Sequence, residues 1–465
     1  MTALPLLPEF IHPERLPGEP ADGPPSAGWL ALAIGLRCVR IAALVAIGAP
    51  LWPVFLVLAW RFGWPPTAMR WSRARRWWRL IGEAPAAPRG PGGMTRGWLR
   101  LKVLDHLARA PFAGLAWLVD EVVWGRRLDA VVVVAPLIEI SAARSGSTQL
   151  ARYLEADETL AAPSAAQMFL PWLWLWRVAR RLGRGVDRAR LDARVHARLP
   201  PAFAQRHEGD LFGTDTFEAP FYLAQGITMS LWLGPECFAR EFGQGTLPDE
   251  NRRLWEGDFV AFFDRIARKT LLFAGPLPDG TARRVFIKGH FLAAADALAR
   301  RYADARFLTM ARAPGPRIQS TVNFLRANPI GGPLGAPPWG ALAEGLVRSE
   351  IAYCESEMAW FAGDGADAED AMDGRGPRRC VLRFDDYVRD LEGTMAKVYR
   401  ECLDRDVLPP HVPRSHAPRV RKDYLLDRSL AQLGVDAAGL DARLSGYIDW
   451  CRGDQSATPS LRIQR

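Results

Sequence analysis

A buried strand followed at once by a loop of small residues constrains this 465-residue chain more than any other stretch. Residues 130–140 are apolar, rich in β-branched side chains and almost without alternation, which is typical of a central parallel strand buried on both faces. A helical pattern resumes at Gln149. Loop amides and a helix N-terminus in this order favour an anion, so we expect a phosphate-binding loop. Its residues are Arg144, Ser145, Gly146, Ser147 and Thr148.

Two later strands also end in polar residues. Residues 283–290 end in Lys288, Gly289 and His290, and residues 306–310 lead to Arg312 with Ser320 on the helix that follows. A histidine can accept a proton near neutral pH, and a guanidinium makes bidentate contact with phosphate. Each pattern alone is also compatible with an ordinary strand, loop and helix.

Taken in this order, the three segments resemble the bacterial sulfotransferases that depend on 3′-phosphoadenosine 5′-phosphosulfate. In that family a Lys/Arg-Ser-Gly-Ser/Thr-Thr loop follows a hydrophobic strand, and a later strand ends in Lys-x-His. The resemblance covers roughly residues 129–440. It implies an α/β fold with a central, mostly parallel sheet and helices on both faces, the P-loop-like sulfotransferase fold.

The resemblance also implies a role for each site residue. The loop from Arg144 to Thr148 would hold the 5′-phosphate and the sulfonate, and Arg312 with Ser320 would hold the 3′-phosphate. His290 would deprotonate an acceptor hydroxyl, with Lys288 and Arg144 as charge clamps and with Glu218 as the next candidate for the base. Many cytosolic members have lysine in place of Arg144, and an arginine can only stabilise charge. The scheme needs no metal.

The N-terminal part indicates a membrane attachment. We expect a disordered tail at residues 1–26, a helical anchor at 27–62, basic amphipathic linker helices at 63–128 and the catalytic domain at 129–465. Residues 41–60 form an uncharged apolar run long enough to cross a hydrocarbon core of about 30 Å, although two prolines also allow a re-entrant hairpin. The Arg- and Trp-rich flank that follows favours a catalytic domain facing the cytoplasm. A buried core helix is the alternative.

Charge and composition restrict the kinds of molecule that we expect this protein to bind. The net charge of +9 is spread along the chain without a basic tail or a nucleic-acid-binding motif, so we expect anionic small molecules or lipid head groups as partners rather than nucleic acid. The six cysteines form no metal-ligand pair. The expected attachment of the catalytic domain to a membrane and the Trp-rich segments favour a lipid or another hydrophobic alcohol as acceptor. A glycan or a small phenol is the alternative.

Two other classes of protein are open at this point. A degenerate P-loop kinase would need Mg²⁺ and an aspartate after a strand, for which Asp385 and Asp386 are available, but the loop lacks the lysine of that class. A non-catalytic, membrane-anchored scaffold with the same fold is the other alternative.

Overall fold

The computed structural model describes residues 27–84, 94–183, 186–206, 211–242, 249–327, 334, 337–362, 377–416 and 427–453. The tail expected at residues 1–26 therefore lies outside the described residues.

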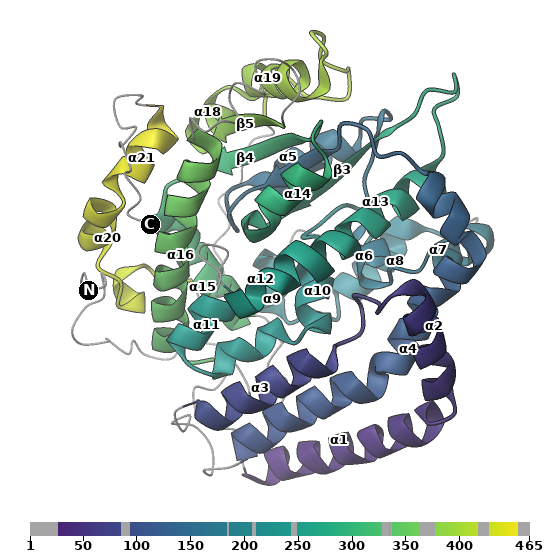
Figure 1. Cartoon of the computed structure of the whole chain (residues 1–465). Helices are drawn as coiled ribbons and strands as arrows, with labels where there is room; N and C mark the ends of the chain where they lie inside the picture. The colour runs from purple at the N-terminus through teal and green to yellow at the C-terminus, as the bar shows by residue number, and fades with distance from the viewer. Residues whose placement is uncertain are drawn as a thin grey trace.

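A five-stranded sheet with the order β2-β3-β1-β4-β5 forms the centre of the fold (Figure 1). Every pair of neighbouring strands is parallel, with Glu139 opposite Lys288 on one side of β1 and opposite Leu308 on the other. This confirms the parallel sheet predicted from the sequence. Its strands are β1 (Leu137–Ile140), β2 (Leu160–Ala161), β3 (Arg284–Gly289), β4 (Arg306–Ala311) and β5 (Arg378–Arg383).

Alternate residues of the strands enter two separate hydrophobic clusters, so both faces of the sheet are covered. Ile138 and Ile287 pack with residues of α13 (Val260–Ala274) in one cluster, whereas Leu137 and Phe286 pack with residues of α5 (Ser147–Glu155) in the other. The two-residue period of a strand explains this division. Helices on both faces were predicted and are confirmed.

Other helices surround these layers. Two of them, α15 and α16, carry residues of a further hydrophobic cluster beside the sheet. Their bounds are α14 (Ala295–Arg301), α15 (Pro314–Ala327), α16 (Trp339–Ala362), α18 (Phe384–Arg389), α19 (Leu391–Leu403), α20 (Ala437–Arg443) and α21 (Ser445–Arg452). In chain order, the α-helices that follow β2 and precede α13 are α6 (Ala165–Phe169), α7 (Leu173–Leu182), α8 (Arg188–His196), α9 (Pro201–Arg206), α10 (Ala219–Ala224), α11 (Pro235–Phe242) and α12 (Asp249–Arg253).

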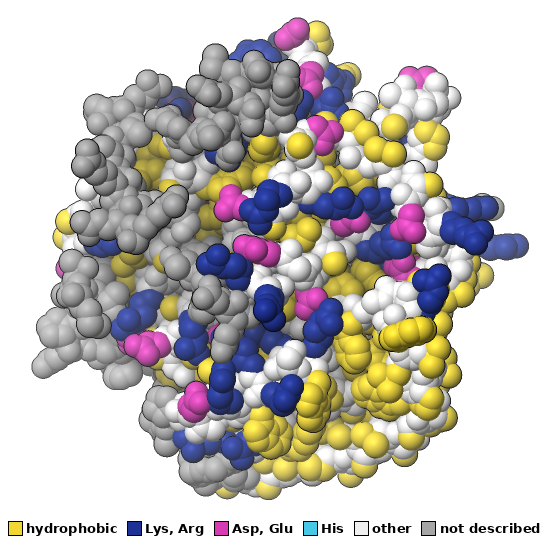
Figure 2. Space-filling model, in the orientation of Figure 1, with side chains coloured by type: hydrophobic (Ala, Val, Ile, Leu, Met, Phe, Trp, Pro, Cys, Tyr) yellow, Lys and Arg dark blue, Asp and Glu magenta, His cyan; other side chains and the backbone are white. Residues whose placement is uncertain are grey.

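The described residues of the N-terminal part form the helices α1 (Ala27–Gly48), α2 (Leu51–Phe62), α3 (Trp71–Glu83) and α4 (Met94–Ala130). The apolar run over residues 41–60 is interrupted, because the chain leaves α1 after Gly48 and begins α2 past Pro50, which has no amide to continue the helix. Among the described residues, α1 is the helix whose length and composition would allow it to cross a bilayer. Hydrophobic side chains gather on this part of the surface, over α2 and along α1 (Figure 2).

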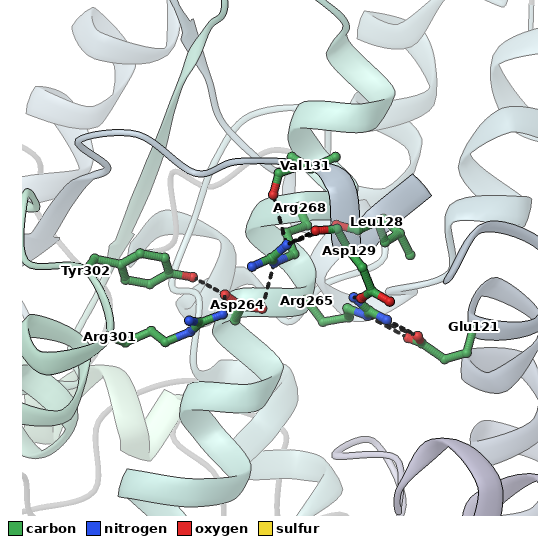
Figure 3. A network of polar contacts seen from close by, with 9 residues as sticks. All are labelled: Glu121, Leu128, Asp129, Val131, Asp264, Arg265, Arg268, Arg301 and Tyr302. Carbon is green, nitrogen blue, oxygen red and sulfur yellow. Dashed lines mark hydrogen bonds and ion pairs between the residues drawn. The ribbon is translucent and has the colours of Figure 1, made fainter. Parts of the chain in front are cut away.

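The long helix α4 continues to Ala130, across the expected start of the catalytic domain at residue 129. The prediction of one strand over residues 130–140 is therefore wrong for its first half, where Val132 remains 75% exposed. Arg268 of α13 explains this end, because its Nη1 donates to the carbonyls of Leu128, Asp129 and Val131 at 2.8–3.1 Å (Figure 3). The sequence pattern could not show these tertiary contacts.

Candidate active site

The loop after β1 has the backbone shape of an anion-binding turn. Arg144 has φ +63° and Gly146 has φ +98°, and α5 begins directly afterwards. Left-handed residues in a turn bring successive amides to one side, where they can surround an anion. Gly146 is also required by space, because a Cβ there would lie 2.9 Å from the ring of Phe384. The expected strand, loop and helix are all present.

One hydroxyl in this loop is buried without a hydrogen-bond partner among the described residues. This is the Oγ of Ser145, a residue with no exposed surface. Buried polar atoms are nearly always paired, so an unpaired hydroxyl inside an amide-rich turn fits a site that receives an acceptor such as a phosphate oxygen. Ser147, also buried, opens α5 beside it.

The loop meets the predicted 3′-phosphate residues. Arg144 donates from Nε to the Oγ of Ser320 on α15 at 2.8 Å, and from Nη1 to the carbonyl of Arg206 at 3.2 Å. Arg312, just after β4, donates from Nη1 to the carbonyl of Arg144 at 2.6 Å. Its guanidinium also lies 4.0 Å from the centre of the Phe384 ring. Arg312 and Ser320 lie 168 and 176 positions after Arg144 in the sequence, and both contact this one loop.

Lys288 reaches the same loop from β3. Its Nζ donates to the Oγ1 of Thr148 at 3.2 Å and lies 3.8 Å from a carboxylate oxygen of Asp215. The side chain is almost fully buried, so its charge acts with little screening by solvent. Lys288 is therefore placed to offset negative charge that develops next to Thr148.

His290 follows β3 and turns toward the start of the loop. Its Nδ1–H donates to the carbonyl of Ser141 at 2.7 Å, which leaves the acceptor lone pair on Nε2. Burial, reinforced by the nearby charge of Lys288, lowers the pKa of His290 to about 3. The imidazole is consequently neutral at physiological pH.

Glu218 supports this histidine from the turn before α10. Its Oε2 accepts the backbone N–H of His290 at 2.9 Å, and burial raises the pKa of the carboxyl to about 7. The contact depends on Gly289, because a Cβ at that position would lie 2.3 Å from the same oxygen. Glu218 thus fixes the end of β3.

Sequence reasoning missed two residues at the base of the site. Glu139 lies fully buried within β1, where its carboxylate accepts a hydrogen bond from Ser141 and burial raises its pKa to about 8. The Oγ of Ser141 in turn accepts the backbone N–H of Met310 at 2.8 Å. A single carboxylate inside an otherwise apolar strand was the signal that could have revealed this pair.

Two further sequence candidates directly follow Phe384, whose ring lies beside Gly146 and the guanidinium of Arg312. Asp385 and Asp386 stand in the first turn of α18, where Asp386 pairs with Arg389. In the described parts of the chain, no group of three or more His, Cys, Asp or Glu side chains is arranged to hold a metal ion.

Comparison with known proteins identifies the fold. No family model and no curated protein matches the sequence. Two solved structures do match. The sulfotransferase STF9 from Mycobacterium avium has a TM-score of 0.52 at 17% identity over 86% of this chain and 95% of that one. The sulfotransferase STF1 from Mycobacterium tuberculosis H37Rv has a TM-score of 0.54 at 16% identity over 85% and 98%.

The matched share is larger than residues 129–465 alone make up, so the likeness extends into the N-terminal helices. The region of resemblance expected from the sequence was too short. With both neighbours drawn from one class of enzyme, the chain has the sulfotransferase fold.

Proposed function

We propose that this protein transfers a sulfonate group from 3′-phosphoadenosine 5′-phosphosulfate to the hydroxyl of an acceptor. The observation that carries the proposal is the convergence of Arg312, Ser320 and Lys288 on the loop after β1. Arg312 and Ser320 come from the segment that follows β4 and Lys288 comes from the end of β3, and the resemblance implied a place beside the donor for each of them.

The residues present suit the donor's charge distribution. In this proposal Arg144 and the loop amides hold the 5′-phosphate and the sulfonate, with the unpaired hydroxyl of Ser145 as an additional donor. Arg312 and Ser320 hold the 3′-phosphate. A guanidinium suits this role because it stays charged and offers a planar fork of donors.

His290 is the base in this proposal. Its neutral Nε2 takes the proton of the acceptor hydroxyl as that oxygen forms a bond to sulfur and the bond from sulfur to the phosphate oxygen breaks. Lys288 and Arg144 offset the charge on the departing phosphate oxygen. Bound phosphates beside these two cations would also counter the lowering of the His290 pKa that they cause.

We assign Glu218, the alternative base, to positioning. The Oε2 of this side chain is already engaged by the backbone of His290, and the residue is only 1% exposed. A carboxylate held in this way orients the strand end that carries Lys288 and His290.

The acceptor we propose is a lipid or another hydrophobic alcohol, met at a membrane by a catalytic domain that faces the cytoplasm. An apolar pocket of about 110 Å³ supports this choice. It lies between α10, which begins directly after Glu218, and the segment around Pro66 next to the N-terminal helices. Phe169, Trp172, Phe221 and Phe262 are among its lining residues, so it suits hydrocarbon better than a sugar.

Calorimetric titration with adenosine 3′,5′-bisphosphate, in detergent and without metal, tests the donor site. We expect micromolar binding to the wild type and a loss of at least tenfold in Arg312→Ala. Arg348→Ala, which removes an arginine paired with Glu344 on α16, is the matched control and should bind like the wild type. Binding of magnesium-ATP alone would indicate a kinase, and binding of neither nucleotide would indicate a scaffold.

A further inference from the structure

Helix α1 lies alongside α4 for most of its length (Figure 1). Near its middle the guanidinium of Arg37 lies 4.1 Å from the centre of the Trp98 ring. At its end Gly48 approaches Phe112 so closely that a Cβ would lie 3.1 Å from the ring. The two helices therefore share the same depth relative to any membrane.

Charged residues shared by α1 and α4 oppose a bilayer crossing at this position. Asp105 is buried between the helices and pairs with Arg37, Arg40 and Arg109 at 3.7, 3.2 and 2.9 Å. The side chains of Arg40 and Arg109 are 50% and 43% exposed, so in a crossing α1 these guanidiniums would face hydrocarbon. Charges exposed there are costly.

The opposite side of α1 is nevertheless apolar. Leu32, Leu36 and Val39 follow helical spacing and are more than half exposed, and α1 contains no acidic residue. Exposed apolar side chains of this kind need apolar surroundings. Among the described residues, the buried positions of α1 are Leu30, Ala33 and Gly48, and its face with Leu32, Leu36 and Val39 is left uncovered.

The neighbouring helices extend this surface and border it with arginine and tryptophan. Trp60, near the end of α2, is 86% exposed and precedes Arg61. On the other side of α4, the exposed Trp78 of α3 lies under the guanidinium of Arg100 at 5.1 Å. Lys and Arg side chains, with some Asp and Glu between them, lie above and to the left of the hydrophobic area (Figure 2). Tryptophan and arginine are the side chains expected at lipid head groups.

We propose that α1 and α2 lie in the plane of one leaflet of an anionic bilayer, with their exposed apolar side chains in the acyl boundary and no helix crossing. A second copy of the chain is a poorer occupant of this surface, because two arginine-rich borders would face each other. Anionic head groups complement the same borders. The inference does not depend on sulfonate transfer.

Flotation with vesicles of phosphatidylcholine, with or without phosphatidylglycerol, tests the surface. The full chain should bind vesicles that contain phosphatidylglycerol more tightly than those without. The double variant Leu36→Asp/Val39→Asp should bind at least tenfold more weakly, because two large apolar side chains no longer enter the membrane. Val407→Asp, at a position 77% exposed after α19, should bind like the wild type.

Labelling with a membrane-impermeant maleimide separates the in-plane arrangement from a crossing helix. Cysteines are placed at either end of α1, as Ala27→Cys and Ala49→Cys, in a Cys38→Ser background. Both positions should react from outside the vesicle. Protection of one end would overturn the proposal, as would an absence of vesicle binding together with a dimer that the Leu36→Asp/Val39→Asp variant dissociates.

Discussion

The substitution Glu218→Gln allows a measurement of how the ionisation of the buried carboxyl beside His290 affects the free energy of unfolding. Burial raises the pKa of Glu218 from 4.5 to about 7, so the folded protein holds its proton more tightly than the unfolded chain does. The stability that this proton provides is complete below pH 4.5 and is lost as the pH rises through about 7. A shift of this size corresponds to roughly 3 kcal/mol.

Glutamine has nearly the same shape, can still accept the backbone N–H of His290 and does not ionise. The difference in the free energy of unfolding between the variant and the wild type should therefore change by about 3 kcal/mol in favour of the variant between about pH 4 and about pH 8. Urea denaturation in mild detergent, followed by tryptophan fluorescence at each pH, measures this difference.

Glu344→Gln is the matched control, because it removes a partly exposed carboxylate that pairs with Arg348 on the surface of α16. For Glu218→Gln, a change of this free-energy difference below about 1 kcal/mol corresponds to a pKa shift of less than one unit. That result would refute the assignment of Glu218 as a group held protonated by burial. Activity gives a second reading, because a positioning residue replaced by its amide should retain most of kcat.

Two further substitutions test the same site. His290→Asn keeps a donor for the Ser141 carbonyl and should lower kcat by about 10²- to 10⁴-fold while adenosine 3′,5′-bisphosphate still binds in calorimetry. In the wild type, with donor saturating, kcat/KM for the acceptor should stay flat from weakly acidic to neutral pH, because burial, the largest cause of the lowered His290 pKa, persists when the phosphates are bound. A tenfold fall per unit below pH 7 would instead identify Glu218 as the base. Gly289→Ala should destabilise the protein by about 1–3 kcal/mol in urea denaturation, because its Cβ would displace the carboxylate that caps His290. Gly446→Ala, where a Cβ meets nothing within 4 Å, should not.

Local signals in the sequence predicted the parts of the site that are contiguous along the chain. A strand, a turn with one glycine and a helix form one short segment, so the geometry around Arg144 and Gly146 could be anticipated from residue types alone. Lys288 and His290 could be placed for the same reason, since both stand at the end of one strand.

The predictions that failed depended on contacts between distant segments. Residues 130–134 have the composition of a strand, yet α4 occupies the chain as far as Ala130 and Arg268 holds the carbonyls of Leu128, Asp129 and Val131 against α13, so the strand begins only at Leu137. The interruption at Pro50 is a different case, because the proline is a local signal that had already left a re-entrant hairpin open. Glu139 was overlooked because no motif contains it, and only the register of β1 with β3 places it beside Lys288.

The arginine contacts at the end of α4 also determine where the catalytic site lies relative to α1 and α2. Arg265 pairs with Glu121 and Asp129 of α4, so the helix that supports α1 is fixed to α13 a few residues before β1 begins (Figure 3). If α1 and α2 lie on lipid as proposed, α4 is the element that joins them to the sheet. An acceptor anchored in the leaflet would have to extend its hydroxyl to a catalytic site held at a constant height. Selection among membrane alcohols would then depend on the length of the segment between the hydroxyl and the acyl chain.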